Sequence, residues 1–211
     1  MKKIHIFTLI IIIISFLAGI YLYDFMPEKI ASHWNAKGQV DEYMSKFWGL
    51  FLMPIVCIGV FFLLLIIPKI DPLKKNVDKF RKYFDSFIFL IVLFLVYIYA
   101  LTIIWNLNIE FDMNKSILPA IGLLFFYSGV LIGHAKRNWF IGIRTPWTLS
   151  SDIAWDKTHK LGGVLFKIAG ILAFVGLIFP NIAILIIMIP VILFTIFLFI
   201  YSYVVYKKTI I

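Results

Sequence analysis

Residues 138–163 read NWFIGIRTPWTLSSDIAWDKTHKLGG, and this segment separates two long apolar runs of the chain. It holds three of the six tryptophans, together with an arginine, a histidine and two aspartates. The other polar segments are shorter or consist mainly of charged residues. The apolar runs around the segment decide the fold class, and the segment itself is the first place to look for a functional signature.

The composition is typical of a membrane protein and excludes a soluble domain. Hydrophobic residues make up 63% of the 211 residues, charged residues make up only 15%, and the mean hydropathy is +1.00. An average globular chain is about half apolar and about a quarter charged. The single cysteine, Cys57, lies in an apolar run, so an internal disulfide is impossible. The length fits one integral membrane domain without a sizeable soluble core.

Six apolar runs are long enough to cross a bilayer, whose core of ~30 Å takes about 20 helical residues. They cover residues 4–23, 47–67, 86–106, 117–133, 163–179 and 182–206. The first run follows two lysines, as the core of a signal peptide does, but it is longer than such a core and no small-residue cleavage site follows it. We therefore predict an all-α integral membrane protein with six transmembrane helices and an uncleaved first span.

The distribution of basic residues predicts the orientation, because cytoplasmic loops carry an excess of lysine and arginine. Sixteen of the 20 lysines and arginines lie at the termini, in residues 69–82, and in or near the 138–163 segment. The opposite loops hold four bases and six acids. We predict a multi-pass plasma-membrane protein with both termini and the Arg144 loop in the cytoplasm and the His33 loop outside. The basic stretch 69–82 would also attract anionic membrane lipids.

The six spans form two sets of three. Because three is an odd number, a second copy of a three-span unit would cross the membrane in the opposite direction. This layout predicts two inverted halves, as in many transporters. By its loops the chain divides into residues 1–84, with two spans and the outer His33 loop, and residues 85–211, with four spans and the inner Arg144 loop. The spans carry no Asp, Glu, Lys or Arg near their middle. That absence disfavours a coupled ion transporter or pump.

Small residues predict which spans pack closely. Gly129 and Gly133 form a small-xxx-small pair in the fourth span, and Ala169, Ala173 and Gly176 form a stripe in the fifth. Such stripes allow helix backbones to approach each other in lipid. Close packing of these two spans would fix the ends of the loop between them.

The outer loop is an amphipathic candidate surface. We predict a short helix from Pro27 to Trp34, because proline is tolerated in a first helical turn, and then a turn at Gly38. The candidate residues for binding an extracellular ligand, such as a peptide, are His33, Trp34, Asp41 and Tyr43. The alternative is an interfacial anchor, since Trp and Tyr favour the headgroup layer without a ligand. A zinc site is disfavoured because only one histidine lies on this side.

The inner loop is predicted to contain an ordered turn and the entry of a helix. Residues 138–148 lack helical periodicity and contain Gly142 and Pro146 as breakers. A helix is predicted from Ser150 or Ser151, whose hydroxyl would cap it, straight into the fifth span. Residues on one face of that helix would be Asp152, Asp156, His159 and Gly163.

Three interpretations of the inner loop differ in what its polar residues do. An acid–base pair of Asp156 and His159 is disfavoured, because no nucleophile or phosphate cradle accompanies it. We therefore expect no enzyme activity, catalytic residue, metal or cofactor. A helix entry held by capping and by pairing of Arg144 with an aspartate, and a docking surface for a cytoplasmic protein, both remain open.

Two stretches resemble a known family. The pattern N-x-x-x-G-x-R-T-P-W-T followed by W-x-x-x-H-x-x-G resembles the signature of the SdpI family of bacterial membrane proteins. The residues that match it are Asn138, Gly142, Arg144, Thr145, Pro146, Trp147, Thr148, Trp155, His159 and Gly162. The outer stretch MPEKIASHWNAKGQVDEYMSKFWGLFLMP resembles the domain of unknown function that precedes this signature in many members.

The resemblance implies a membrane immunity protein that is also a receptor. It would bind a secreted antimicrobial toxin peptide, protect the cell, and hold a cytoplasmic transcriptional repressor at the membrane without itself binding nucleic acid. The outer residues would contact the peptide, and the inner signature with Asp156 would serve signalling or structure. The alternative function is a small transporter or exporter of an amphipathic peptide or lipid.

Overall fold

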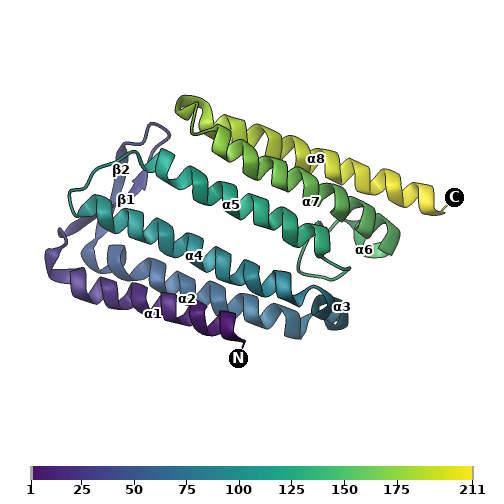
Figure 1. The fold of residues 1–211 in the computed structure, drawn as a ribbon, viewed down its shortest axis with the longest axis horizontal. Helices are drawn as coiled ribbons and strands as arrows, with labels where there is room; N and C mark the ends of the chain where they lie inside the picture. Colours follow the sequence, from purple (N-terminus) through teal and green to yellow (C-terminus); the bar gives the residue numbers. More distant parts are fainter. Residues whose placement is uncertain (1, 211) are drawn as a thin grey trace.

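The computed structural model describes residues 2–210, and six long helices dominate it (Figure 1). All six are long and apolar enough to cross a membrane, which confirms the six predicted spans and makes the chain a multi-pass membrane protein. Their bounds are α1 Lys3–Leu22, α2 Lys46–Ile70, α4 Arg81–Asn106, α5 Met113–His134, α7 Asp152–Val175 and α8 Ala183–Ile210. Short elements connect them: η1 Tyr23–Phe25, β1 Lys29–Trp34, β2 Val40–Ser45, α3 Lys74–Lys79, α6 Pro146–Ser150 and η2 Pro180–Ile182.

The helices form two groups of three that meet along α4 and α5 (Figure 1). In the first group α1, α2 and α4 contact one another, whereas in the second α7 lies between α5 and α8. Both ends of the chain lie at one end of the bundle, which we call the termini end. The strands β1 and β2 lie at the opposite end, which we call the hairpin end. The prediction that the two groups are inverted halves stays a prediction.

Glycines bring α5 and α7 into backbone contact. A Cβ at any of four positions would lie closer than 3.0 Å to a backbone atom of the other helix. These positions are Gly122 and Gly129 on α5 and Gly163 and Gly170 on α7. The close packing predicted for the fourth and fifth spans is therefore confirmed, and it fixes both ends of the inner loop.

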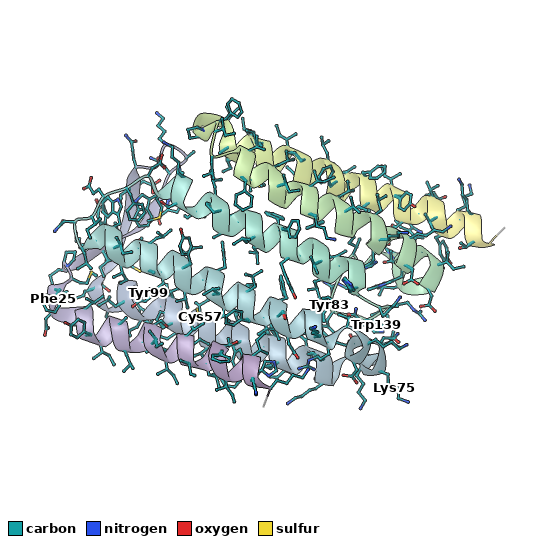
Figure 2. All side chains as sticks on the ribbon, viewed as in Figure 1. Phe25, Cys57, Lys75, Tyr83, Tyr99 and Trp139 are labelled. Carbon is teal, nitrogen blue, oxygen red and sulfur yellow. The ribbon has the colours of Figure 1, made fainter. Side chains whose placement is uncertain are left out.

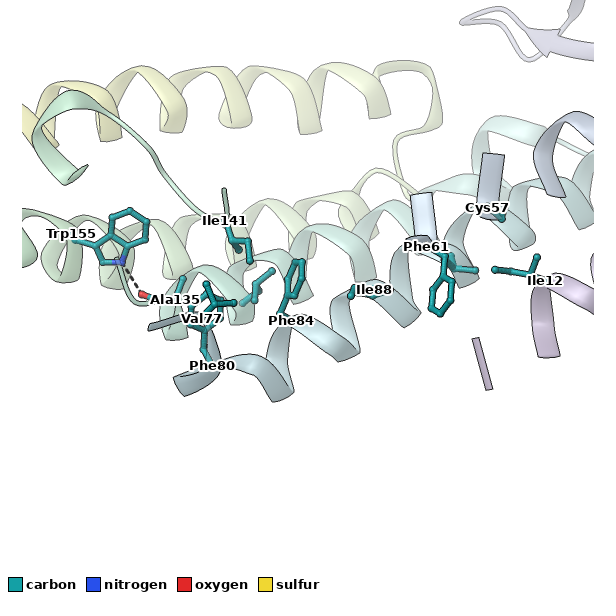
Figure 3. Packing of buried hydrophobic residues seen from close by; sticks show 12 residues of the cluster. Ile12, Cys57, Phe61, Val77, Phe80, Phe84, Ile88, Ala135, Ile141 and Trp155 are labelled. Carbon is teal, nitrogen blue, oxygen red and sulfur yellow. Dashed lines mark hydrogen bonds between the residues drawn. The ribbon is translucent and has the colours of Figure 1, made fainter. Parts of the chain in front are cut away.

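The main hydrophobic core runs along the first helix group and ends at the inner loop (Figure 3). It starts between Ile12 of α1 and Phe61 of α2 and continues through Phe84 and Ile88 of α4. At the termini end it includes Trp155, the largest fully buried side chain. A large aromatic side chain at this position joins the second helix group to the core of the first.

A buried carboxylate anchors the start of α1 on α4. The side chain of Asp85 is 3% exposed, and its Oδ1 accepts a hydrogen bond from Nε of Arg81 at 2.7 Å. Lys2 Nζ lies 2.5 Å from Oδ2, and His5 Nε2 lies 3.2 Å from Oδ1. Because a buried charge without partners is costly, these bases hold the first turn of α1 in place.

The outer loop is a β-hairpin, so the predicted helix from Pro27 to Trp34 is wrong. β1 and β2 pair antiparallel, with a register irregularity on either side of His33. The turn between them is closed by Asn35, whose Oδ1 accepts from Lys37 N at 2.8 Å and Gln39 N at 3.1 Å. Gly38 adopts φ 75°, a conformation that glycine tolerates. This turn chemistry favours a hairpin over an eight-residue helix, which is marginal without packing.

Candidate functional site

Asparagines from α4 and α5 hold the hairpin in position. Asn106, 8% exposed at the end of α4, accepts a hydrogen bond from Ala31 N at 2.8 Å and donates one to Ala31 O at 3.1 Å. Its amide thus takes the place of a neighbouring strand at the edge of β1. Asn114 of α5 donates to Asn35 O at 3.3 Å and to Ala36 O at 3.0 Å. The hairpin is therefore bound to both helix groups.

The structure brings together two of the four predicted ligand-binding residues. His33 Nδ1 and Asp41 Oδ1 lie 2.5 Å apart across the strands, and both side chains are substantially exposed. The hydrogen bond and the negative charge of Asp41 raise the pKa of His33 above its usual 6.5, and Glu42 adds a smaller effect in the same direction. This pair gives the exposed end of the hairpin a charge that depends on pH.

The two predicted aromatic ligand contacts face different surroundings. Trp34 packs edge-to-face on Trp105 of α4, with ring centroids 5.6 Å apart. Its indole Nε1 is buried without a hydrogen-bond partner within the described residues. Tyr43 is 59% exposed on β2. Trp34 therefore helps to seat the hairpin on α4, and Tyr43 is available to a ligand.

A small cavity lies between the hairpin, α2 and α4. Its volume is about 60 Å³, and it is partly open to the outside. Its lining includes Ile30, Ser32, Met44, Trp48, Tyr99 and Thr102. These are mainly apolar side chains with hydroxyls from three residues, a mixture that suits one amphipathic side chain of a ligand.

At the termini end, Asn138 organises the first half of the inner loop. Its side chain is fully buried and makes four hydrogen bonds to nearby backbone. The Oδ1 atom accepts from Phe140 N at 2.9 Å and Ile141 N at 2.6 Å. The Nδ2 atom donates to Lys136 O and Ile141 O, each at 2.8 Å. The prediction of an ordered turn in this part of the loop is confirmed.

His159 and Gly142 join the loop to α7. Nε2 of His159 accepts from Ile143 N at 3.0 Å, and Nδ1 lies 2.9 Å from Trp155 O. Because one ring nitrogen must accept and the other donate, this arrangement fits a neutral ring protonated at Nδ1. Gly142 has φ 114°, and a Cβ there would overlap Nε2 of His159. The Gly142 position therefore requires glycine both for its backbone conformation and for space.

Trp155 and His159 form a stacked pair inside the protein. Their ring centroids are 3.8 Å apart with an interplanar angle of 13°. The indole Nε1 of Trp155 donates to Ala135 O at 2.8 Å, a bond drawn in Figure 3. His159 is 1% exposed, so neither of its ring nitrogens is free to exchange protons with a substrate.

The signature residues Pro146, Trp147 and Thr148 begin α6, and Thr145 is its N-cap. This short helix was not predicted, because residues 138–148 were expected to form a turn. Thr145 and Thr148 form a capping box, with Pro146 in the first turn. Thr145 Oγ1 also lies 3.0 Å from Ser202 Oγ of α8. Trp147 packs against Phe199 and Tyr203 of α8, with centroids 5.0 and 5.1 Å away. These contacts fasten the loop to the last helix.

The acidic residues of the loop do not pair with Arg144, so that expectation is wrong. Arg144 donates to Trp139 O at 2.9 Å. Asp152 lies 2.7 Å from Arg137 Nε, and Asp156 lies 3.2 Å from Lys136 Nζ. The predicted cap is confirmed, because Ser151 Oγ accepts from Ala154 N.

The residues predicted to share one face of α7 differ in their exposure to solvent. Asp152 and Asp156 are exposed, while His159 and Gly163 are buried. Asp156 and His159 therefore do not form an accessible acid–base pair. Within residues 2–210, no group of three or more His, Cys, Asp or Glu side chains is arranged to hold a metal ion.

Comparison with known proteins gives a separate match for each of these two regions. Residues 134–202 match the SdpI/YfhL protein family, and residues 10–58 match a domain of unknown function, DUF1648. The chain is 29% identical over 209 residues to the immunity protein SdpI of Bacillus subtilis (strain 168), covering 99% of this chain and 98% of that protein. Residues 134–202 are thus similar to the SdpI/YfhL family, and the whole chain is similar to one immunity protein. No solved structure matches it.

The first matched region lies in the first helix group and its hairpin, and the second lies in the second helix group and the inner loop. The DUF1648 region covers most of α1, the whole hairpin and the first half of α2. The SdpI/YfhL region covers the inner loop, α6, α7 and most of α8. Helix α4 and nearly all of α5 lie outside both, so the boundary at residue 84 stays a prediction.

The residues that connect the SdpI/YfhL region to the rest of the chain were not predicted from the sequence. Asp71, 2% exposed after α2, accepts from Trp139 N at 2.9 Å, and Asn76 of α3 donates to Arg137 O at 2.9 Å. At the hairpin end, Asn106 and Asn114 have the same kind of role. In the sequence each of these is a polar residue at the edge of an apolar run. Such residues are common, and their position does not show which distant residue they contact.

Proposed function

We propose that this chain is a membrane immunity protein that binds a secreted antimicrobial peptide at its hairpin end. The observation that carries the proposal is the similarity to an immunity protein over almost the whole of both chains. A match of this extent includes the hairpin, the inner loop and all six spans, so the proposal concerns the whole architecture and not one motif.

The proposed orientation places the hairpin outside the cell and both termini in the cytoplasm. The support is the charge distribution, because sixteen of the 20 bases lie at the termini, in residues 69–82, or in the inner loop and helix α7 that follows it. A peptide that arrives from outside would then meet the hairpin first.

The hairpin has features that suit an amphipathic, cationic peptide. Asp41, Glu42 and Tyr43 are exposed in a row on β2, and His33 lies beside Asp41. The carboxylates would attract basic residues, and Tyr43 together with the cavity below the hairpin would accept an apolar side chain. The Asn106 and Asn114 contacts hold this surface rigid, which lowers the entropy cost of binding.

We propose that the inner loop signals peptide binding at the hairpin by holding a cytoplasmic repressor at the membrane. Several polar side chains of the signature already have partners inside the protein: Asn138, Thr145 and His159 accept from backbone N–H groups, and Thr148 donates to backbone carbonyls. The parts that remain accessible to a partner are therefore the exposed tip of the loop and the charged first turns of α7. In this proposal the signature gives the docking surface its shape and does not itself contact the partner.

The test is protection of a sensitive bacterium that expresses the chain and is exposed to the matching toxin. Asp41→Asn combined with Tyr43→Ala should reduce protection while membrane levels stay normal, because both groups are exposed and neither is in the core. The matched control is Lys37→Gln with Gln39→Ala, two exposed changes in the same hairpin turn. Full protection by the Asp41 and Tyr43 variant would remove the hairpin from the proposed site.

Two further measurements separate the parts of the proposal. A cysteine introduced at Lys37 should react with an impermeant maleimide in intact cells, and one at Lys208 should not; the reverse pattern would overturn the orientation. Movement of the toxin across proteoliposomes that contain the purified chain would indicate a transporter, since an immunity receptor binds its ligand without moving it.

A further inference from the structure

Helix α3 presents lysines at the surface of the termini end while its apolar side is buried. Val77 is fully buried and Phe80 is 1% exposed, and both belong to the main core with Trp155. Lys74, Lys75 and Lys79 of the same helix are exposed. A short helix anchored in this way between the ends of two membrane spans lies at the level where the bilayer meets water.

Hydrogen bonds fix α3 to the tip of the inner loop. Asn76 Nδ2 donates to Arg137 O, and Asp71 Oδ2 accepts from Trp139 N, both at 2.9 Å. At this tip Trp139 is 51% exposed and Phe140 is 38% exposed. Lys75 and Trp139 lie at the same end of the molecule in Figure 2. The lysines and the two aromatic side chains are therefore parts of one rigid surface.

The charges on this surface are not neutralised within residues 2–210. Residues 69–82 hold six bases, and of these only Arg81 pairs with a carboxylate, that of Asp85. The segment has two acids, and Asp71 is buried with both oxygens bonded to backbone N–H groups. Asp78 is the remaining acid and is exposed. The surface therefore carries a positive charge that an anion can neutralise.

We propose that α3 and the tip of the inner loop bind the phosphate headgroup of an anionic phospholipid. Lys74, Lys75 and Lys79 would contact the phosphate, and Trp139 and Phe140 would lie in the interfacial layer beside the glycerol and upper acyl chain. Clusters of lysine next to membrane spans attract anionic lipids, and tryptophan favours the same depth. This surface is distinct from the proposed peptide site at the hairpin.

A lipid fits these observations better than a soluble acidic protein does. Exposed Ile70 ends α2 immediately before this segment, so the apolar surface of a span continues into the basic surface. An occupant with an apolar part and an anionic part next to each other matches both surfaces, and a phospholipid has that form.

The experiment is a titration of the purified full-length chain in detergent with POPG or POPC, with bound lipids counted by native mass spectrometry. The wild type should retain POPG in preference to POPC. Each lysine near an anionic lipid contributes roughly a fivefold change in affinity, so Lys74→Gln, Lys75→Gln and Lys79→Gln together should weaken POPG binding on the order of a hundredfold. The control with Lys37, Lys207 and Lys208 changed to Gln removes the same charge elsewhere and should change it only slightly.

Four further outcomes decide the proposal. Equal POPG affinity in the α3 variant and the control, or equal retention of POPC and POPG by the wild type, would overturn it. Excess glycerol 3-phosphate should fail to displace POPG, and displacement would mean a site for free phosphate. Asn76→Ala keeps every lysine but removes one of the two hydrogen bonds between the α3 segment and the loop, together with the bond that holds Lys79. It should therefore lower POPG affinity severalfold, and unchanged affinity would refute a built site. These readouts use no toxin and are independent of immunity.

Discussion

Replacing Asn138 by alanine should open the first half of the inner loop. The side chain makes four hydrogen bonds of 2.6 to 2.9 Å, and it is fully buried. Each such bond contributes about 1 kcal/mol net, and a buried amide left without a partner costs about 1–3 kcal/mol. Phe140 N lies near the surface and can turn to water, but Ile141 is 7% exposed. We therefore expect a loss of about 3–5 kcal/mol in the free energy of local opening.

The assay is hydrogen exchange of the detergent-solubilised chain, followed by mass spectrometry of peptides that cover residues 136–145. A loss of this size predicts that protection of the Ile141 amide falls a hundredfold or more. The control is Asn108→Gly, because Asn108 is exposed with φ 64° and glycine tolerates that conformation. Protection within threefold of the wild type in Asn138→Ala would refute the view that this side chain organises the loop.

Other predictions concern the hairpin and the α7 contact. Asp41→Asn should lower the pKa of His33 toward 6.5, measured by NMR of the imidazole, because the carboxylate raises it. Since a raised folded pKa stabilises the protonated state, exchange protection of the hairpin should be greatest below about pH 6.5 and decline as pH rises through the folded pKa; a pH-independent hairpin would contradict this. Gly142→Ala should destabilise the protein by about 2 kcal/mol or more in thermal unfolding, through strain and overlap with His159. Asn106→Ala should increase exchange of the β1 amides while leaving helix content unchanged, and an unaffected β1 would show that the asparagine clamp is dispensable.

The helices were predictable because their signal is local and strong. Each span is an apolar run whose length alone decides that it crosses a membrane. The α5–α7 contact was also predictable, since glycine and alanine at helical spacing have a direct steric consequence. The cap at Ser151 belongs to the same class, because a hydroxyl before a helix acts on its nearest backbone amides.

The hairpin and the partners of charged residues were not predictable by the same reasoning. The strand β1 depends on Asn106, which lies 75 residues later and supplies both hydrogen bonds at its edge. Several carbonyls and carboxylates near Arg144 in the sequence could have accepted its hydrogen bond. The folded loop brings Trp139 O to the guanidinium. In these cases the competing local conformations are close in energy, so contacts with residues distant in the sequence determine which conformation forms.

Helix α2 has a mechanical consequence for communication between the two ends of the molecule. It begins at Lys46, directly after β2, and ends at Ile70, directly before the carboxylate that holds Trp139. Its 25 residues span about 37 Å without a loop. The hairpin and the inner loop are therefore attached to opposite ends of the same helix, α2. A push or a twist delivered to the hairpin would reach the inner loop as a displacement of Asp71, and it would shift Phe61 of the core with it.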